Sequence, residues 1–242
     1  DADDVVEQWL MQQFQRPFSL EQDAVYWRMA LVRIAPTRHA LLTQYHHLIA
    51  DGWSTKIVID RVTDLYNALY FERVVSPAEL ISYADFVARE ADYARSSAFD
   101  RDLAFWDETL SRLLEPLFQQ KVGRVDALRM PKANVHRFTL SRTFYTQLHA
   151  WAALQQVTTY HLLLTGLCLY FSRTMQQSAM IVGIPGLNRR GARFKKVLGM
   201  CASMSPLVIE YDPKATLQSL VKQTSVTIQN VHKHQRYPLT AI

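Results

Sequence analysis

Hydrophobic residues follow two different spacings along this chain, and each spacing predicts a different kind of element. Apolar residues that recur every three or four positions predict amphipathic helices, whereas runs rich in β-branched and aromatic residues predict strands. Helices are expected at residues 4–16, with Asp4 as N-cap, and at 54–70, 82–114, 141–156, 158–173 and 215–231. Strands are expected at residues 25–34, 40–46, 136–140, 179–184 and 205–211.

The order of these elements indicates a mixed fold. Strands and helices alternate without the regular strand–helix–strand rhythm of a doubly wound sheet, so α+β is the expected class. The pattern restarts after residues 115–130, a stretch of mixed composition with a proline near each end and a glycine in the middle. We interpret this stretch as the connection between two halves, residues 1–114 and 131–242.

Composition and charge narrow the class of protein. The chain has 242 residues, of which 49% are hydrophobic and 20% charged, as in ordinary globular proteins. The net charge of +5 is dispersed apart from the basic run 188–196, and no nucleic-acid motif accompanies that run. Two cysteines, Cys168 and Cys201, are too few for a disulfide framework. No apolar run approaches the ~18 residues of a membrane span, so we expect a cytoplasmic protein without nucleic-acid partners.

The segment His46-His47-Leu48-Ile49-Ala50-Asp51-Gly52 lies where an expected strand ends. Side chains alternate along a strand, so only one of the two histidines enters a given cleft. This argues against a shared metal ion, and no metal site is expected. A single histidine in a cleft suits proton transfer, because its ordinary pKa of about 6.5 is near neutral pH. A buried Asp51 needs a cationic partner, and Gly52 permits a tight turn with an exposed N–H. The same residues also fit two non-catalytic histidines beside a turn.

Four motifs resemble, in order and approximate spacing, those of the condensation domains of non-ribosomal peptide synthetases. The histidine segment resembles the HHxxxDG signature, and related acyltransferases include chloramphenicol acetyltransferase. The other three motifs lie at residues 82–86, 197–207 and 234–239, which resemble the YxDFA, IGxFVNTxPL and HQDxPFE segments. The resemblance implies an α+β fold of two chloramphenicol acetyltransferase-like halves in a V-shaped pseudo-dimer. Residues 1–114 would belong to the N-terminal half and 131–242 to the C-terminal half.

Some positions depart from the family pattern. Ser203 stands where the family often has an asparagine in the reaction chamber, and Arg236 replaces an acidic residue. No segment resembles the family's early or closing motifs, so we expect a domain that is partial at both ends.

The resemblance also implies a reaction and its partners. The amine of an aminoacyl group on a carrier domain would attack a donor acyl thioester on a second carrier domain and form an amide. Both substrates would ride on phosphopantetheine arms, or on coenzyme A for an initiating donor, and no cofactor would be bound. An adenylation domain would be a neighbour. His47 would deprotonate or orient the amine, and the Gly52 N–H would stabilise the oxyanion.

The remaining site residues have structural or channel roles in this interpretation. His46 would be structural, and Asp51 would pair with Arg189 or Arg190 from the other half. The residues expected to line the substrate channel are Trp53, Ser54 and Ser203.

Two other functions stay open, along with the nature of the donor. A coenzyme A-dependent acyltransferase of small molecules shares HxxxDG, and a non-catalytic domain of this fold would only dock partners. Residues 184–191 resemble the form found in lipopeptide-initiating condensation domains. A fatty acyl donor is therefore a hypothesis alongside aminoacyl and peptidyl donors, and it predicts an apolar channel near the basic run.

Overall fold

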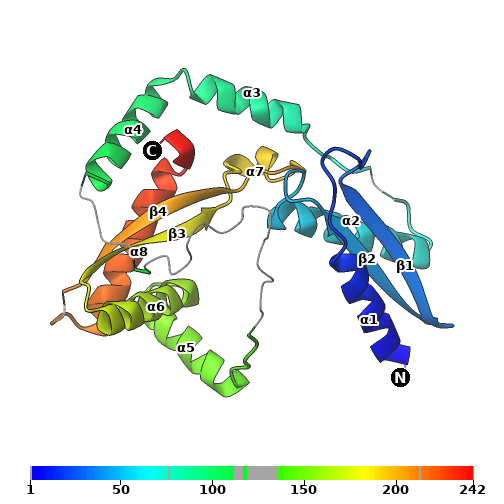
Figure 1. The fold of residues 1–242 in the computed structure, drawn as a ribbon, viewed down its shortest axis with the longest axis horizontal. Helices are drawn as coiled ribbons and strands as arrows, with labels where there is room; N and C mark the ends of the chain where they lie inside the picture. Colours follow the sequence, from blue (N-terminus) through cyan, green and yellow to red (C-terminus); the bar gives the residue numbers. More distant parts are fainter. Residues whose placement is uncertain (1, 76, 112–116, 119–135, 213, 242) are drawn as a thin grey trace. The chain divides into compact units, whose positions relative to one another are not determined.

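The structure, a computed structural model, describes residues 2–75, 77–111, 117–118, 136–212 and 214–241 (Figure 1). The chain divides into two units. The first unit comprises Asp1–Arg95 and Leu187–Ala202, and the second comprises Ser96–Gly186 and Ser203–Ile242. The first unit contains α1 (Ala2–Phe14), β1 (Trp27–Ala35), β2 (Arg38–Tyr45), α2 (Gly52–Tyr70), α3 (Tyr83–Tyr93) and α7 (Gly191–Phe194).

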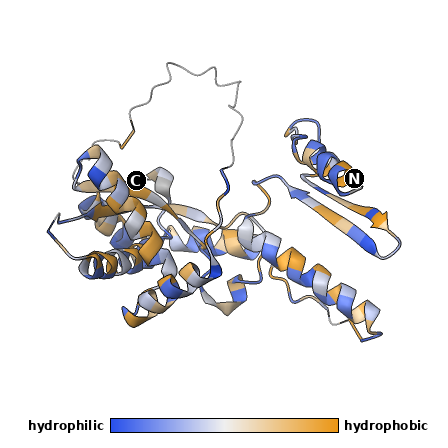
Figure 2. Ribbon diagram, turned by 90° about the horizontal axis from the view of Figure 1, so that it is seen from below, coloured by the Kyte–Doolittle hydropathy of each residue, from blue (hydrophilic) through white to orange (hydrophobic). Residues whose placement is uncertain are grey.

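The two strands of the first unit, which correspond to the strands expected at residues 25–34 and 40–46, form an antiparallel hairpin. Trp27 lies opposite Tyr45, and Leu31 lies opposite Leu41. Directly opposed residues share a face, so these four side chains lie on one side of the hairpin. Bands of hydrophobic and hydrophilic residues follow one another along both strands (Figure 2). Leu31 is 70% exposed, so this apolar face is largely uncovered within the unit.

Helix α1 packs against β1 of the hairpin. The buried Gln44 fixes the end of this helix, because its Nε2 donates to the carbonyl oxygens of Phe14 (3.1 Å) and Arg16 (3.2 Å). These carbonyls lie in the last turn and beyond, where no intrahelical partner is available. A polar side chain on the covered face thus satisfies the backbone at the helix end.

Helix α2 begins at Gly52 because Asp51 caps it. The Asp51 carboxylate accepts a hydrogen bond from the Ser54 backbone N–H, the usual N-cap geometry. Ser54 is the one residue of α2 that is buried. Apolar residues further along the helix, such as Tyr66 and Leu69, are exposed. The N-terminal turn of α2 is therefore the part that the first unit holds firmly.

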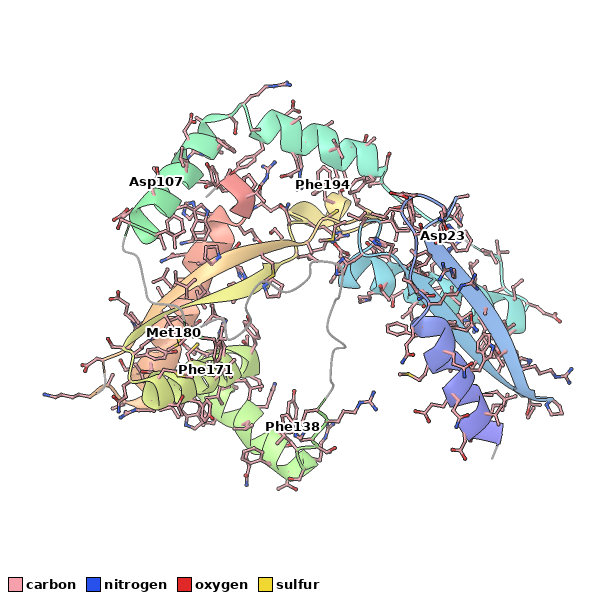
Figure 3. All side chains as sticks on the ribbon, in the orientation of Figure 1. Asp23, Asp107, Phe138, Phe171, Met180 and Phe194 are labelled. Carbon is pink, nitrogen blue, oxygen red and sulfur yellow. The ribbon has the colours of Figure 1, made fainter. Side chains whose placement is uncertain are left out.

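The second unit contains the larger apolar core. Its elements are α4 (Ser97–Thr109), α5 (Arg142–Leu154), α6 (Thr159–Met175), β3 (Ala179–Gly186), β4 (Ser203–Glu210), α8 (Leu217–His234) and the 3-10 turn η1 (Leu239–Ala241). Strands β3 and β4 are antiparallel, α8 packs on β4, and α6 packs on both α8 and β3. Met180, marked in Figure 3, is completely buried among these elements.

The last turn of α8 is fixed to α4 by polar and aromatic contacts. Trp106, 1% exposed, donates from Nε1 to the His234 carbonyl oxygen at 3.1 Å. The His234 ring stacks on Phe105 with centroids 4.0 Å apart, and its Nδ1 lies 2.7 Å from Asp102 Oδ1. Helix α4 thereby belongs to the second unit.

Some sequence predictions differ from the structure. Residues 136–140 form no strand, since neither two-stranded sheet includes them, and Phe138 is 76% exposed. Helix α1 starts at Ala2, so Asp4 lies inside its first turn instead of capping it. Most of the expected connection 115–130 lies outside the described residues. The assignment of residues 1–114 and 131–242 to two acetyltransferase-like halves stays a prediction.

The described part of the chain has neither a membrane-spanning helix nor a cluster of metal ligands. None of its helices combines the length and apolar character that a membrane span requires. No three histidine, cysteine, aspartate or glutamate side chains gather there in a way that could hold a metal ion.

Candidate active site

The two adjacent histidines lie in different environments at the end of β2. The strand ends at Tyr45, one residue earlier than expected, but the His46 N–H still donates to the Tyr26 carbonyl oxygen at 2.9 Å. A turn follows, closed by the Ile49 N–H and the His46 carbonyl oxygen at 3.0 Å. His46 is thus the last residue held by the hairpin, and His47 is the first residue of the turn.

His46 is half-buried and fully engaged in local contacts. Its Nδ1 accepts from the Leu48 N–H at 3.1 Å, which leaves the proton of a neutral ring on Nε2. Its ring lies against Phe18 and Tyr26, with centroids 6.2 and 6.1 Å away. These contacts fit the structural role that the sequence suggested.

His47 is exposed and lines a pocket of about 290 Å³ at the start of α2. The pocket lies wholly within the first unit. Its lining comprises Phe14, Thr43, Gln44, Tyr45, His47, Ala50, Asp51, Gly52 and Thr55. Of the two histidines, only His47 lines this pocket. The turn that begins at His47 separates the environments of the two side chains.

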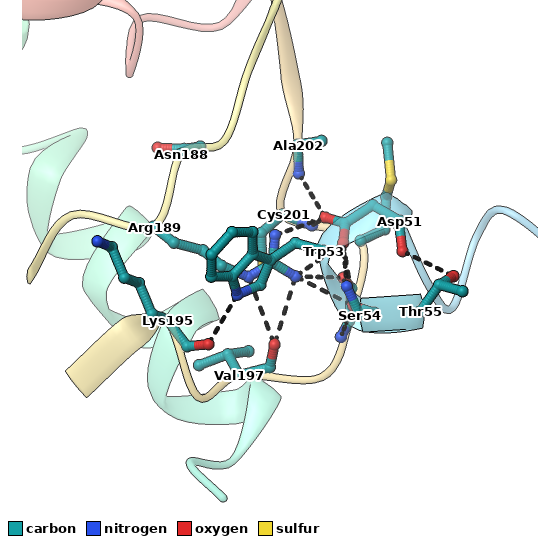
Figure 4. Close-up of polar contacts among 12 residues, drawn as sticks. Asp51, Trp53, Ser54, Thr55, Asn188, Arg189, Lys195, Val197, Cys201 and Ala202 are labelled. Carbon is teal, nitrogen blue, oxygen red and sulfur yellow. Dashed lines mark hydrogen bonds and ion pairs between the residues drawn. The ribbon is translucent and has the colours of Figure 1, made fainter. Parts of the chain in front are cut away.

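Asp51 forms a buried, bidentate ion pair with Arg189. Arg189 Nη1 donates to Asp51 Oδ2 at 2.7 Å, and Nη2 donates to Oδ1 at 3.0 Å (Figure 4). The two side chains are 0% and 2% exposed. The predicted pairing is confirmed for Arg189, whereas Arg190 is exposed at the N-terminus of α7. The partners are 138 residues apart in sequence, yet both belong to the first unit rather than to different ones.

Backbone donors complete the surroundings of the Asp51 carboxylate. Oδ1 accepts from the Ser54 N–H at 2.9 Å, and Oδ2 accepts from the N–H groups of Cys201 (3.0 Å) and Ala202 (2.9 Å). Burial by itself would raise the pKa of this carboxyl group. The Arg189 guanidinium and the three backbone donors outweigh burial, so the net effect is a lowered pKa. Asp51 is therefore a fixed anion and not a proton donor.

Ser54 joins the ion pair to the loop around Gly199. Its hydroxyl lies 3.0 Å from Asp51 Oδ1 and 2.8 Å from the Gly199 carbonyl oxygen, and its one proton serves either acceptor. Ser54 Oγ also accepts a hydrogen bond from the Gly199 N–H at 3.0 Å. An added Cβ at Gly199 would lie 2.1 Å from the Tyr83 ring, so this close approach requires glycine. Ser54 is 1% exposed, and the prediction that it lines a channel is wrong.

The other expected channel residues are engaged elsewhere. Trp53 Nε1 donates to the Lys195 carbonyl oxygen at 2.8 Å, which holds the basic loop against the start of α2. Ser203 begins β4 in the second unit and donates from Oγ to the Gln235 carbonyl oxygen at 3.3 Å. Neither side chain lines the His47 pocket. Their channel roles stay predictions.

Gly52 occupies the first position of α2. An added Cβ would meet no atom within 4 Å, and the residue does not have a positive φ. The structure therefore does not use the conformational freedom that glycine offers at this position. Because the first N–H groups of a helix have no intrahelical partner, the Gly52 N–H remains a candidate donor beside His47.

Comparison with known proteins identifies the family. The condensation-domain model matches residues 1–242. Surfactin synthase subunit 1 of Bacillus subtilis (strain 168) is 25% identical over 242 residues, which are 98% of this chain and 7% of that protein. Tyrocidine synthase 3 of Brevibacillus parabrevis is 27% identical over 241 residues, 95% of this chain and 4% of that protein. The chain belongs to the condensation-domain family of non-ribosomal peptide synthetases.

Solved structures agree on the fold. The first condensation domain of the calcium-dependent antibiotic synthetase superposes with a TM-score of 0.86 at 22% identity, covering 100% of this chain and 53% of that one. The condensation enzyme VibH gives 0.81 at 21%, covering 99% and 55%. The predicted α+β fold of the chloramphenicol acetyltransferase type is confirmed. The chain spans about half the length of these solved domains and a small share of the curated synthetases.

Proposed function

We propose that this chain carries the histidine side of a condensation site that forms an amide from a donor acyl thioester and a carrier-bound aminoacyl acceptor. The observation that carries this proposal is the contrast between the two histidines. His46 is committed to the hairpin, whereas His47 lines a pocket that is also lined by Asp51, the anion of the buried ion pair.

In the proposed reaction the acceptor amine attacks the thioester carbonyl carbon. The C–N bond forms, the C–S bond breaks, and the donor sulfur leaves as a free thiol. An α-amine has a pKa of about 7.7–8, so at neutral pH it must lose a proton before it attacks. His47 is the group in the pocket suited to take that proton or to orient the amine. The Gly52 N–H, at the positive end of α2, would face the developing oxyanion.

The low pKa of Asp51 supports a structural role for it in this scheme. A carboxylate that already accepts five hydrogen bonds from nitrogen donors has little capacity left for substrate. Its contribution is to fix the turn that carries His47 and Gly52. The division of labour is then one side chain in the pocket that takes or orients the proton of the amine and one permanent ion pair behind it.

The proposed partners follow from the family. Donor and acceptor carrier domains would bring the substrates on phosphopantetheine arms, and an adenylation domain would load the acceptor. The curated relatives are far longer than this chain, as expected of multidomain synthetases. The basic run 188–196 would suit the phosphate of an arm or acidic carrier surfaces.

The fatty acyl donor hypothesis predicts an apolar channel near the basic run. A largely apolar pocket of about 560 Å³ does open beside Lys195 and Lys196. It shares no lining residue with the His47 pocket. A starter condensation domain of rhizomide synthetase, solved with C8-CoA, has the same fold (TM-score 0.80). Competition between octanoyl and aminoacyl thioester donors decides between the two classes.

The test of the reaction uses the full natural protein in which this sequence occurs. Loaded donor and acceptor carriers are mixed, and intact mass spectrometry follows the amide product. We expect His47→Ala to reduce the rate by about 100- to 10,000-fold with an unchanged melting temperature. His46→Ala should lower the melting temperature, because it removes the ring contacts and the Leu48 bond. His39→Ala, an exposed histidine on β2, is the matched control.

Three results would count against the proposal. Equal rates for His47→Ala and wild type would remove His47 from the reaction. Transfer to a small alcohol from free coenzyme A thioesters, without transfer between carriers, would favour the small-molecule acyltransferase. Carrier binding with no product in either assay would indicate a docking domain.

A further inference from the structure

The segment at residues 82–86 resembles a family motif, yet its tyrosine has no role in the reaction proposed above. Tyr83 is the first residue of α3. Its hydroxyl donates to the Met200 carbonyl oxygen at 2.9 Å, although the two residues are 117 positions apart in sequence. Both residues belong to the first unit. The motif therefore contacts the loop that surrounds the buried ion pair.

The peptide group between Met200 and Cys201 is held at both ends. Its carbonyl oxygen accepts from Tyr83, and its N–H, on Cys201, donates to Asp51 Oδ2 at 3.0 Å. A trans peptide is planar, and its C=O and N–H point in opposite directions. Tyr83 and the Asp51 carboxylate therefore bind opposite sides of one rigid group, and a rotation of that group breaks both hydrogen bonds.

The rest of this loop is fixed from other directions. Residues 198–202 belong to no helix or strand, so side chains have to hold their backbone in place. Ser54 Oγ accepts from the Gly199 N–H and lies 2.8 Å from the Gly199 carbonyl oxygen. The Met200 carbonyl oxygen is instead bound from α3. Without the Tyr83 hydroxyl, the polar groups of the next peptide would be held only at the Asp51 end within the described part of the chain.

The Tyr83 side chain is itself fixed and protonated. Its ring stacks on Phe86 with centroids 5.6 Å apart, and it lies directly against Gly199. Partial burial raises the pKa of the phenol above its usual value, and the neighbouring Cys201 and Asp51 add to this effect. The hydroxyl consequently keeps its proton at neutral pH and acts as a donor to the carbonyl oxygen.

We infer that Tyr83 is a positioning residue, which acts on the reaction through this peptide group and the Asp51 carboxylate. Its hydrogen bond polarises the peptide, which strengthens the Cys201 N–H as a donor to Asp51. Asp51 in turn caps α2 and fixes the turn that carries His47. The effect of Tyr83 on catalysis rests on the proposed function, whereas its effect on the loop and on Asp51 does not.

The experiment compares two tyrosine variants of the full natural protein. Tyr83→Phe keeps the ring and removes the hydroxyl, so kcat for amide formation should fall about three- to tenfold while KM for the loaded acceptor stays the same. Tyr26→Phe is the matched control in the same unit, because its hydroxyl also donates to a carbonyl oxygen at 2.9 Å, that of Leu20. That bond lies outside the contacts that surround Asp51, so kcat should be unchanged. Each variant loses one hydrogen bond, and the two should melt at similar temperatures.

Hydrogen exchange measured by mass spectrometry reports on the loop directly and needs no reaction. In Tyr83→Phe, residues 200–202 should exchange faster than in wild type, with no change in α8. A weaker N–H donor lowers the pKa of Asp51 less, so the increase of exchange that accompanies protonation of Asp51 should begin at a higher pH than in wild type. Tyr26→Phe should match wild type in both respects. A loop contact without an effect on Asp51 would leave that pH unchanged.

The outcomes separate this inference from the proposed function. Unchanged exchange at residues 200–202 in Tyr83→Phe overturns the inference whether or not the protein is active. Faster exchange with an unchanged pH dependence also overturns it. In a protein that forms the amide, an unchanged kcat of Tyr83→Phe, or an equal fall in Tyr26→Phe, overturns it too and leaves the function standing. Where wild type forms no amide, the proposed function fails, and the earlier onset in acid by itself supports the link from Tyr83 to Asp51.

Discussion

Each of the two units of this molecule is stabilised internally by a different kind of contact. The second unit buries a large apolar cluster that joins α4, α6, α8 and both strands, and Met180 and Leu207 in it are completely buried. The first unit buries only a small cluster of Phe86, Val197 and Cys201. Its main buried polar feature is the pair of Asp51 and Arg189 with their backbone partners. The unit that carries the candidate chemistry relies on directional polar contacts, and the other relies on apolar burial.

The difference has a physical reason. Apolar contacts tolerate small changes of geometry, whereas a bidentate ion pair with backbone donors is satisfied by one arrangement only. Replacing a whole buried ion pair with apolar residues is often neutral for stability, but removing one partner leaves an uncompensated charge. The first unit therefore gains a fixed position for the turn of His47 and Gly52, at the expense of greater sensitivity to single substitutions.

The largest expected effect follows from breaking the ion pair. Asp51→Asn should destabilise the first unit by about 3–5 kcal/mol, because Arg189 stays buried without its anion. Hydrogen exchange measured by mass spectrometry should show faster exchange at the start of α2 and at residues 197–202, with little change in α8. Arg189→Lys should not restore protection, since an ammonium cannot make the bidentate contact.

The matched control is an exposed ion pair in the same unit. Asp85 lies 3.1 Å from Arg193, and the side chains are 47% and 64% exposed. Asp85→Asn should change stability by less than about 1 kcal/mol. Normal protection in Asp51→Asn combined with lost amide formation would contradict the structural role and make Asp51 a participant in the reaction.

The second unit should respond to loss of apolar volume. Ile228 on α8 is 1% exposed, and Ile228→Ala should cost about 2–5 kcal/mol through lost burial and the cavity left behind. Val226, 56% exposed on the same helix, gives a control in which Val226→Ala changes stability by about 0.5 kcal/mol or less. Exchange should increase in α6, α8 and β4. A larger increase in hydrogen exchange around Asp51 than in α8 would show that the stability of the first unit depends on that of the second.

Low pH should destabilise the first unit before the second, and this effect should be smaller than those of the substitutions above. The pKa of Asp51 is lowered in the folded state relative to about 3.9 in the unfolded chain. The stabilisation is fully present above that unfolded value and is lost as the pH falls below it towards the folded pKa. Exchange at residues 197–202 should therefore accelerate below about pH 4 before that of α8. In Asp51→Asn this acid dependence should disappear, and an unchanged dependence would assign it to other carboxyl groups.

The sequence alone determined most of the secondary-structure elements and the segment that carries the candidate chemistry, His46 to Gly52. The spacing of apolar residues predicted both strands of the hairpin and most helices, because local spacing decides which face of an element can be buried. The segment from His46 to Gly52 resembles a motif specific enough to imply the family, and the family comparison confirms that identification. The prediction of a strand at residues 136–140 was wrong. A short apolar run forms a strand only where another strand lies beside it, and the spacing of apolar residues along the sequence does not reveal such a neighbour.

Only the tertiary structure decided which distant groups meet. The charge of Asp51 required a cation, but two adjacent arginines fitted equally well until the fold buried Arg189 and left Arg190 in solvent. The backbone donors of Cys201 and Ala202 have no side-chain signature, so no sequence pattern could have revealed them. Contacts of this kind depend on every atom packed around them, and such packing is settled only when the chain has folded.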